Sequence, residues 1–230
     1  MLHKTRGIVL NYIKYKESSV IARIYTEEFG VQSYIINSVR SKKSKKGLAL
    51  LQPLSLLDLV VYYKSQKADG LQRISEYKPS HSFSSIPFQI KKSLMALFIT
   101  ELLSKVLKEE EQQGEVFEFL HQFILYLDHK ESQYENLHLY LMVQLTHYIG
   151  FGIHNRGELE RDGILQKVKT SFDEIYGKIL TLNDATITEE MNCSTDLRRD
   201  ILNYLVRYYQ LHVEGFKEMK SLEVLTQIFQ

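Results

Sequence analysis

The hydrophobic period of this chain changes once, near Ser80, and that change limits the folds available to it. Before Ser80, apolar residues alternate with their neighbours in short runs, a pattern typical of β-strands. After Pro87 they recur every three or four residues, as on one face of an α-helix. The sequence therefore predicts an α+β protein with a β domain over residues 1–80 and a helical domain over residues 81–230.

Five strand-like runs lie between residues 7 and 77, separated by turns such as Glu27-Glu28-Phe29-Gly30. A flat sheet of this size would leave exposed edges, so we expect a small closed or partly closed barrel. The commonest five-stranded barrel is the oligonucleotide/oligosaccharide-binding (OB) fold, which binds ligands on its second and third strands and nearby loops. The residues placed on or near that candidate face are Arg23, Tyr25, Gln32 and Tyr34.

The most basic run of the chain follows the third predicted strand. Residues 40–47 hold five cations and no acid, in the order Arg-Ser-Lys-Lys-Ser-Lys-Lys-Gly. Each Lys or Arg that pairs with a phosphate displaces a condensed counterion, so a basic loop on a barrel suits a nucleic-acid backbone. A solvated surface loop has the same composition, and this run alone favours neither interpretation.

The distribution of charge favours the nucleic-acid interpretation. The whole chain has a net charge of only +1, but residues 1–80 carry 14 basic and 6 acidic side chains. Residues 81–230 carry 15 basic and 22 acidic side chains. This asymmetry indicates a basic module for a polyanion, joined to an acidic helical body with other duties.

The helical half is predicted in some detail. Ser85 and Pro87 start a first helix, whose face contains Ile90, Leu94 and Leu97, and a second helix spans residues 115–128. A capping box at residues 132–135 starts a third helix, which is apolar on nearly every side. Residues 150–181 are expected to be irregular. Ser194 caps a long helix that ends at Gly215, and Ser221 starts the last one.

Several patterns that resemble chemical sites have simpler explanations. Glu118-x-x-His121 and Glu135-x-x-His138 have a di-iron spacing. Glu118, however, falls on the polar side of its helix, and Glu135 belongs to the predicted capping box, so we expect no metal site. The pair Gly150 and Gly152 lacks the third glycine of a dinucleotide fingerprint, and Gly150 suits a helix C-cap. The single cysteine, Cys193, has no neighbouring base, and no cofactor or enzymatic activity is expected.

The N-terminus lacks the apolar core of a signal peptide, and charges interrupt every apolar run before it reaches membrane-spanning length. We therefore expect a cytoplasmic protein with no membrane partner. If it binds DNA, it is also nucleoid-associated.

Several stretches together resemble the bacterial recombination mediator family RecO. In the N-terminal half these are Lys4-Thr5-Arg6-Gly7-Ile8-Val9-Leu10, Tyr25-Thr26 through Gly30, the basic run, and Leu51-Gln52-Pro53-Leu54. In the C-terminal half they are Tyr208-Tyr209-Gln210-Leu211-His212 and Lys220-Ser221-Leu222-Glu223-Val224-Leu225. No single motif is diagnostic, but the combination and its spacing cover nearly the whole chain. The resemblance implies an OB barrel followed by a helical domain.

The resemblance also implies a non-enzymatic function. Such proteins bind single- and double-stranded DNA, anneal complementary strands, engage the C-terminal tail of the single-strand-binding protein, and act with RecR to load the RecA recombinase. Many members carry a four-cysteine zinc module after the central helix. Residues 150–181 contain no cysteine, so this chain is a variant with an irregular insertion in that place and no zinc.

Site residues follow from the resemblance together with the charge pattern. The DNA-binding set is Arg23, Tyr34, Arg40, Lys42, Lys43, Lys45 and Lys46. Candidates for binding the acidic tail of the single-strand-binding protein are Arg198, Arg199 and Arg207, although solvated surface arginines would look the same. Two alternatives remain open: a general nucleic-acid chaperone or RNA-binding OB protein without a recombination role, and a hydrolase or transferase with a dispersed site.

Overall fold

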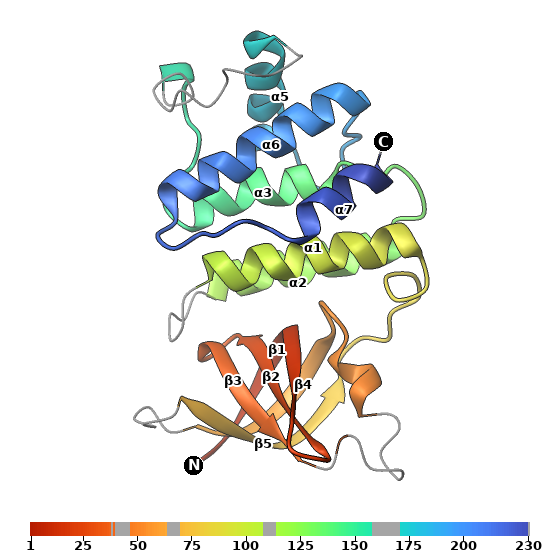
Figure 1. Cartoon of the computed structure of the whole chain (residues 1–230), viewed down its shortest axis with the longest axis vertical. Coiled ribbons are helices and arrows are strands. Elements are labelled where there is room, and N and C mark those ends of the chain that lie inside the picture. The colour runs from red at the N-terminus through yellow and green to blue at the C-terminus, as the bar shows by residue number, and fades with distance from the viewer. Residues whose placement is uncertain (38, 40–46, 64–69, 108–113, 158–170, 230) are drawn as a thin grey trace. The chain divides into compact units, whose positions relative to one another are not determined.

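The computed structural model describes residues 1–37, 39, 47–63, 70–107, 114–157 and 171–229 (Figure 1). These residues form two compact units, Met1–Ile124 and Leu125–Gln230. The period change at Ser80 is confirmed, because the last strand ends at Pro79 and the first α-helix begins at Ile90. The first compact unit nevertheless extends past this point and includes the first helix and most of the second.

The N-terminal half is a closed five-stranded barrel, as predicted. The strand order around the barrel is β1-β2-β3-β5-β4 (Figure 1). Every neighbouring pair is antiparallel except β3 and β5, whose short parallel pairing closes the barrel. The strands are β1 Leu2–Tyr15, β2 Ser19–Thr26, β3 Gly30–Ile36, β4 Leu56–Tyr62 and β5 Leu71–Pro79.

Inward-facing aliphatic residues from all five strands fill the barrel. Val9, Ile24 and Val61 are each 0% exposed. Gly7 is required on β1, since a Cβ there would lie 2.7 Å from the Leu59 side chain and 2.8 Å from that of Ile24. The short 3₁₀ helix η1, Leu48–Leu51, lies between β3 and β4 and buries Leu51 against this core.

Two helices follow the barrel, and the first unit contains all of the first helix and the second as far as Ile124. α1 spans Ile90–Val106, and α2 spans Gly114–His129, close to the predicted 115–128. The predicted start of α1 at Ser85 is wrong: the N-cap is Gln89, and the Ser85 hydroxyl instead accepts a 2.6 Å hydrogen bond from the buried Lys92 ammonium. The predicted buried face is also partly wrong, because Ile90 is 76% exposed and Leu97 is 46% exposed.

The second unit contains α3 Leu137–Tyr148, α5 Phe172–Asp184, α6 Thr195–His212 and α7 Ser221–Ile228. α3 packs against α5 and α6, as expected for a helix that is apolar on nearly all sides. The predicted starts of α6 and α7 are confirmed, and the Ser194 side chain accepts from the Leu197 amide. Gly150 has a left-handed φ of +87° just after α3, as its predicted C-cap role requires.

Two predictions for this unit are wrong. α3 begins at Leu137 after Asn136, with no side-chain cap, so residues 132–135 form no capping box. A capping box is found instead at Ser171 with Glu174, at the start of α5. α5 therefore occupies part of the segment that is predicted to be irregular. In the parts of the chain described, no helix is both long and apolar enough to span a membrane.

Candidate nucleic-acid interface

A continuous row of side chains crosses the outer surface of the barrel from strand to strand. Ile13 of β1 lies opposite Ile21 of β2, which lies opposite Ile35 of β3. Ile35 pairs with Arg73 of β5, and Arg73 pairs with Tyr62 of β4. Directly opposite residues on adjacent strands project to the same side and lie about 5 Å apart. We call these five residues the isoleucine face.

The isoleucine face is accessible to solvent and carries cations. Ile13 is 60% exposed, Tyr62 is 43% exposed, and Arg73 is also exposed. Arg23 lies on the same side of β2 as Ile21 and is half-buried. The Lys16 ammonium, in the turn between β1 and β2, sits 5.3 Å from the centre of the Tyr15 ring. Apolar surface bordered by cations matches a ligand that has both flat apolar rings and phosphates.

Tyr34 does not lie on this face. It pairs with Ala22 rather than Arg23, so its side chain points into the barrel, where it is 0% exposed and belongs to the core. Desolvation in the core raises the pKa of its hydroxyl well above the ordinary value. A side chain enclosed in this way cannot stack on a base. The predicted role of Tyr34 in DNA binding is therefore corrected to a structural one.

Two other residues expected near the face are buried as well. Tyr25 shares the outward side of β2 with Arg23, but α2 covers it, and its ring lies 5.7 Å from that of Phe117. Gln32 points inward, and its amide donates to the Phe29 carbonyl at 2.8 Å. On β2, the part of the outer surface that solvent can reach therefore begins at Arg23 and extends away from α2.

The basic loop lies outside the described residues, and with it Arg40, Lys42, Lys43, Lys45 and Lys46. Its flanking residues, however, are described. Val39 precedes the loop and is 2% exposed, and Leu51 of η1 follows it and is 0% exposed. Both belong to the barrel core. The loop is thus attached at each side to buried positions of the barrel that also carries the isoleucine face.

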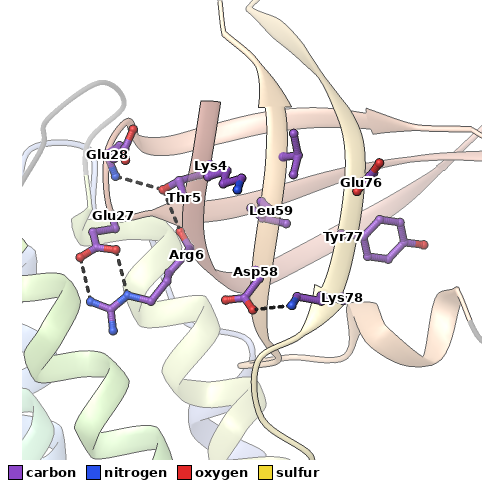
Figure 2. Close-up of a pocket in the computed structure, with 11 residues that line it drawn as sticks. Lys4, Thr5, Arg6, Glu27, Glu28, Asp58, Leu59, Glu76, Tyr77 and Lys78 are labelled. Atoms are coloured by element: carbon purple, nitrogen blue, oxygen red, sulfur yellow. Dashed lines mark hydrogen bonds and ion pairs between the residues drawn. The ribbon is translucent and has the colours of Figure 1, made fainter. Parts of the chain in front are cut away.

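A second patch lies on the outer surface where β1, β4 and β5 meet, and it forms a pocket of about 550 Å³ (Figure 2). Across the three strands, Arg6 of β1 lies opposite Asp58 of β4, which lies opposite Lys78 of β5. In a neighbouring row, Lys4 lies opposite Val60, which lies opposite Glu76. We call these charged residues, Lys4, Arg6, Asp58, Glu76 and Lys78, the ion-pair face. Lys78 and Asp58 are 3.5 Å apart. The pocket is lined by three cations and four carboxylates, so it offers no net positive charge to a phosphate.

Arg6 links the ion-pair face to α2. Its Nε and Nη2 donate to the two carboxylate oxygens of Glu27 at 2.8 and 2.7 Å, and Nη2 also donates to Glu118 at 2.9 Å. Its guanidinium carbon lies 5.1 Å from the centre of the Phe117 ring. The hydrogen bond from Arg6 lowers the pKa of Glu27 below its ordinary value of 4.5. Glu118 therefore faces away from the helix core, as predicted, and binds an arginine there.

The three predicted tail-binding arginines differ from one another. Arg198 donates to Asn136 Oδ1 at 2.6 Å and to the Phe229 carbonyl at 2.6 Å, so its guanidinium holds elements of the second unit together. Arg199 is paired with Asp196. The cavity beside them measures about 10 Å³, room for at most one water molecule. Arg207 is exposed on α6. A pre-formed anion pocket at Arg198 does not fit these contacts.

The second Glu-x-x-His pair is also accounted for. His138 is 1% exposed on α3 and stacks on Phe229, with the ring centres 5.9 Å apart. Burial lowers its pKa to about 3, so the imidazole is neutral at physiological pH. Among the described residues, no three His, Cys, Asp or Glu side chains are grouped so that they could hold a metal ion.

The sequence matches known proteins along nearly its whole length. The family model described as Recombination protein O N terminal matches residues 1–83, and Recombination protein O C terminal matches residues 87–156. A DNA repair protein RecO from Flavobacterium psychrophilum is 33% identical over 239 residues, covering 98% of both chains. One from Phocaeicola vulgatus is 32% identical over 244 residues, covering all of both chains. One from Salinibacter ruber is 30% identical over 147 residues, which are 64% of this chain and 55% of that protein.

Proposed function

This chain belongs to the RecO family of DNA repair proteins, and on that premise we propose that it is a DNA-binding recombination mediator. In this proposal it binds single- and double-stranded DNA, anneals complementary strands and helps to load a recombinase on DNA coated by the single-strand-binding protein. Its role is non-enzymatic. A part in DNA repair and recombination follows from the family itself.

The observation that carries the proposal is a closed barrel whose isoleucine face is bordered by cations. Arg73 and Lys16 are exposed at the isoleucine face, and the loop at residues 40–46 is attached to the same barrel by Val39 and Leu51. The loop adds Arg40 and four lysines, Lys42, Lys43, Lys45 and Lys46, in seven residues. These cations engage phosphates, which carry no sequence information.

The mechanism follows from electrostatics. Two complementary strands repel each other through their phosphates, and cations bound to both strands reduce that repulsion and raise the local strand concentration. Binding should therefore depend strongly on salt and little on base sequence. A protein that acts in this way requires no catalytic group and no cofactor.

The decisive experiment is the annealing of complementary oligonucleotides coated with the cognate single-strand-binding protein. The full chain should accelerate annealing, and addition of RecR should then support loading of RecA. Replacing Lys42, Lys43, Lys45 and Lys46 by Ala should weaken DNA binding and flatten the salt dependence by about 0.7 for each single-strand phosphate that is no longer neutralised. A double variant of exposed lysines in the second unit, Lys217→Ala with Lys220→Ala, is the control and should behave like the wild type.

The two parts of the proposal fail separately. If the four-lysine variant keeps the wild-type salt slope, the loop does not bind the phosphates. If the wild-type chain anneals no complementary strands, coated or bare, the mediator function is wrong.

The partner proposal concerns the acidic helical half. The C-terminal tail of the single-strand-binding protein requires a cation beside apolar surface, and Arg207 and Arg199 are better candidates than Arg198, whose hydrogen bonds are internal. Titration of the tail peptide against Arg207→Ala and Arg199→Ala tests them separately. Unchanged affinity in both variants would move the tail site elsewhere.

A second candidate function is a general nucleic-acid chaperone or RNA-binding protein without a recombination role. It has the same support from the cations, because phosphate contacts do not distinguish RNA from DNA. Competition between structured RNA and single-stranded DNA decides between the two functions, since a recombination mediator should prefer the DNA.

A further inference from the structure

The isoleucine face carries an inference beyond phosphate binding. We propose that Ile13, Ile21 and Ile35 form a contact surface for unpaired nucleobases, so that this part of the barrel selects single-stranded over double-stranded DNA. The inference rests on the proposed function, since it assumes that DNA is the ligand. It assigns a separate task to three uncharged side chains within this face.

The three isoleucines occupy neighbouring positions on the outside of the barrel. They occupy one cross-strand row on β1, β2 and β3, and none belongs to the barrel core. Adjacent strands lie about 4.8 Å apart, so the row forms an aliphatic strip roughly 10 Å across. Ile13 is 60% exposed, and Ile21 and Ile35 are each partly exposed. A contiguous apolar strip on a surface indicates an interaction site.

Cations border this aliphatic strip. Arg73 follows Ile35 in the row, on β5, and Arg23 lies two residues from Ile21 on the same side of β2. Lys16 lies in the turn just after Tyr15, which is on the same side of β1 as Ile13. An apolar protein partner would not need cations on both sides of the strip. Single-stranded DNA does, because its phosphates flank its bases.

Single-stranded and double-stranded DNA differ in whether the flat surfaces of their bases are accessible. In a duplex the flat surfaces of the bases are stacked on one another, and only their edges are open in the grooves. In a single strand the ring surfaces are available, and sequence-tolerant contact with them is the usual way in which such proteins gain affinity. Aliphatic side chains offer a weaker version of that contact, because they bury ring surface without aromatic stacking.

The test compares two single-stranded probes of equal length, a labelled oligothymidylate and an abasic oligonucleotide with the same phosphates and no bases. The wild type should bind oligothymidylate more tightly than the abasic probe. Ile13→Thr keeps a β-branched residue on the strand and should weaken oligothymidylate binding by about three- to ten-fold, as expected when a partly buried aliphatic group is removed. Its affinity for the abasic probe should be unchanged.

A second variant tests the opposite direction. Ile13→Tyr adds an aromatic ring at the same exposed position and should strengthen binding of oligothymidylate but not of the abasic probe. The matched control is Ile90→Thr, an exposed isoleucine at the first position of α1, 76% exposed and outside the isoleucine face, which should leave both affinities unchanged.

The outcomes separate this inference from the proposed function. If Ile13→Thr lowers the affinity for both probes equally, or for neither, the isoleucines do not contact bases and the inference is overturned, while phosphate binding stands. If the wild type binds neither probe, the proposed function itself fails. If the isoleucine face binds a protein in place of DNA, Ile13→Thr should fail to bind that protein, while its affinities for both probes stay unchanged. That result also overturns the inference.

Discussion

Two patches on the outside of the same barrel use charge in opposite ways. On the ion-pair face, cations form ion pairs with carboxylates: Arg6 with Glu27 and Glu118, and Lys78 with Asp58. On the isoleucine face, aliphatic residues separate the cations, and Arg73 has an isoleucine and a tyrosine as its cross-strand neighbours. The first arrangement stabilises the fold locally. In the second, the Arg73 side chain is exposed to solvent.

By our proposal, the pocket on the ion-pair face is a poorer site for a single strand than the isoleucine face. The pocket of about 550 Å³ lies on the ion-pair face, where a phosphate would have to displace carboxylates that are already bound to the cations. The isoleucine face lies outside this pocket, yet its cations and apolar strip match both components of a single strand. For a polymer ligand, the distribution of charge matters more than the depth of a pocket.

The largest effect is expected from the tyrosine beneath the isoleucine face. Tyr34→Leu should lower the free energy of unfolding by about 2 kcal/mol, because a buried ring is replaced by a smaller side chain. The DNA affinity of the folded variant should not change, since Tyr34 is 0% exposed. The measurements are denaturant unfolding and fluorescence anisotropy with labelled single strands. Tyr62→Leu, on the exposed side, is the matched variant and should show the reverse: normal stability and weaker binding.

The next largest effect is expected at Arg73, and Lys78, a second exposed cation on the same strand, serves as its comparison. Arg73→Gln should weaken single-strand binding by about ten-fold and lower the salt slope by about 0.7, the value for one phosphate contact. Lys78→Gln, also on β5 but on the ion-pair face beside Asp58, should leave both quantities unchanged. Equal losses of affinity in the two variants would show that the two faces do not differ in DNA binding.

The smallest effect concerns stability on the ion-pair face. Arg6→Ala should lower the free energy of unfolding at neutral pH by about 1 kcal/mol, a modest value because the paired side chains are about one third or more exposed to water. Lys78→Ala is the control and should lower the free energy of unfolding by less, since the Lys78 side chain is 75% exposed. Thermal or denaturant unfolding measures both variants.

The pH dependence of the Arg6 effect follows from the sign of the Glu27 shift. The pKa of Glu27 in the folded protein is lower than its ordinary value of 4.5, so the pair contributes its full stability above that value. The contribution disappears as the pH falls through the lower, folded pKa. The difference between wild type and Arg6→Ala should therefore shrink below pH 4.5. A difference that stays constant down to the acid transition would mean that the Glu27 pair does not carry the effect.

The strand pattern predicts the barrel but not which side of β3 faces the core. Residues 31, 33 and 35 and residues 32, 34 and 36 each mix apolar with polar side chains, so alternation alone is ambiguous there. Only the register with β2 decides it, by pairing Ala22 with Tyr34 and Arg23 with Ser33. The isoleucine face escapes sequence-based prediction for the same reason. Its members are far apart in the chain, and Ile13, Ile21 and Ile35 look like core residues until their cross-strand partners are known.

Short local motifs likewise predict the helix starts and buried helix faces only in part. The cap at Ser194 is predicted correctly because the side chain bonds an amide three residues away, an interaction contained within the sequence window. The equivalent interpretation of residues 132–135 fails, because the chain is not helical until Leu137. The apolar stripe with Ile90 and Leu97 belongs to a helix that is apolar on most sides, where periodicity cannot select one face for the core.

The order of the two halves, the barrel, the concentration of cations in residues 1–80 and the family resemblance can all be read from the amino-acid sequence. All of these depend on local period, local charge or short motifs. The tertiary structure alone decided which side chains share a surface: that Tyr34 is buried, that Arg6 is neutralised by Glu27 and Glu118, and that three isoleucines from three strands form one strip. The physical reason is that a one-residue change of register reverses every side chain of a strand, and register is set by partners distant in the sequence.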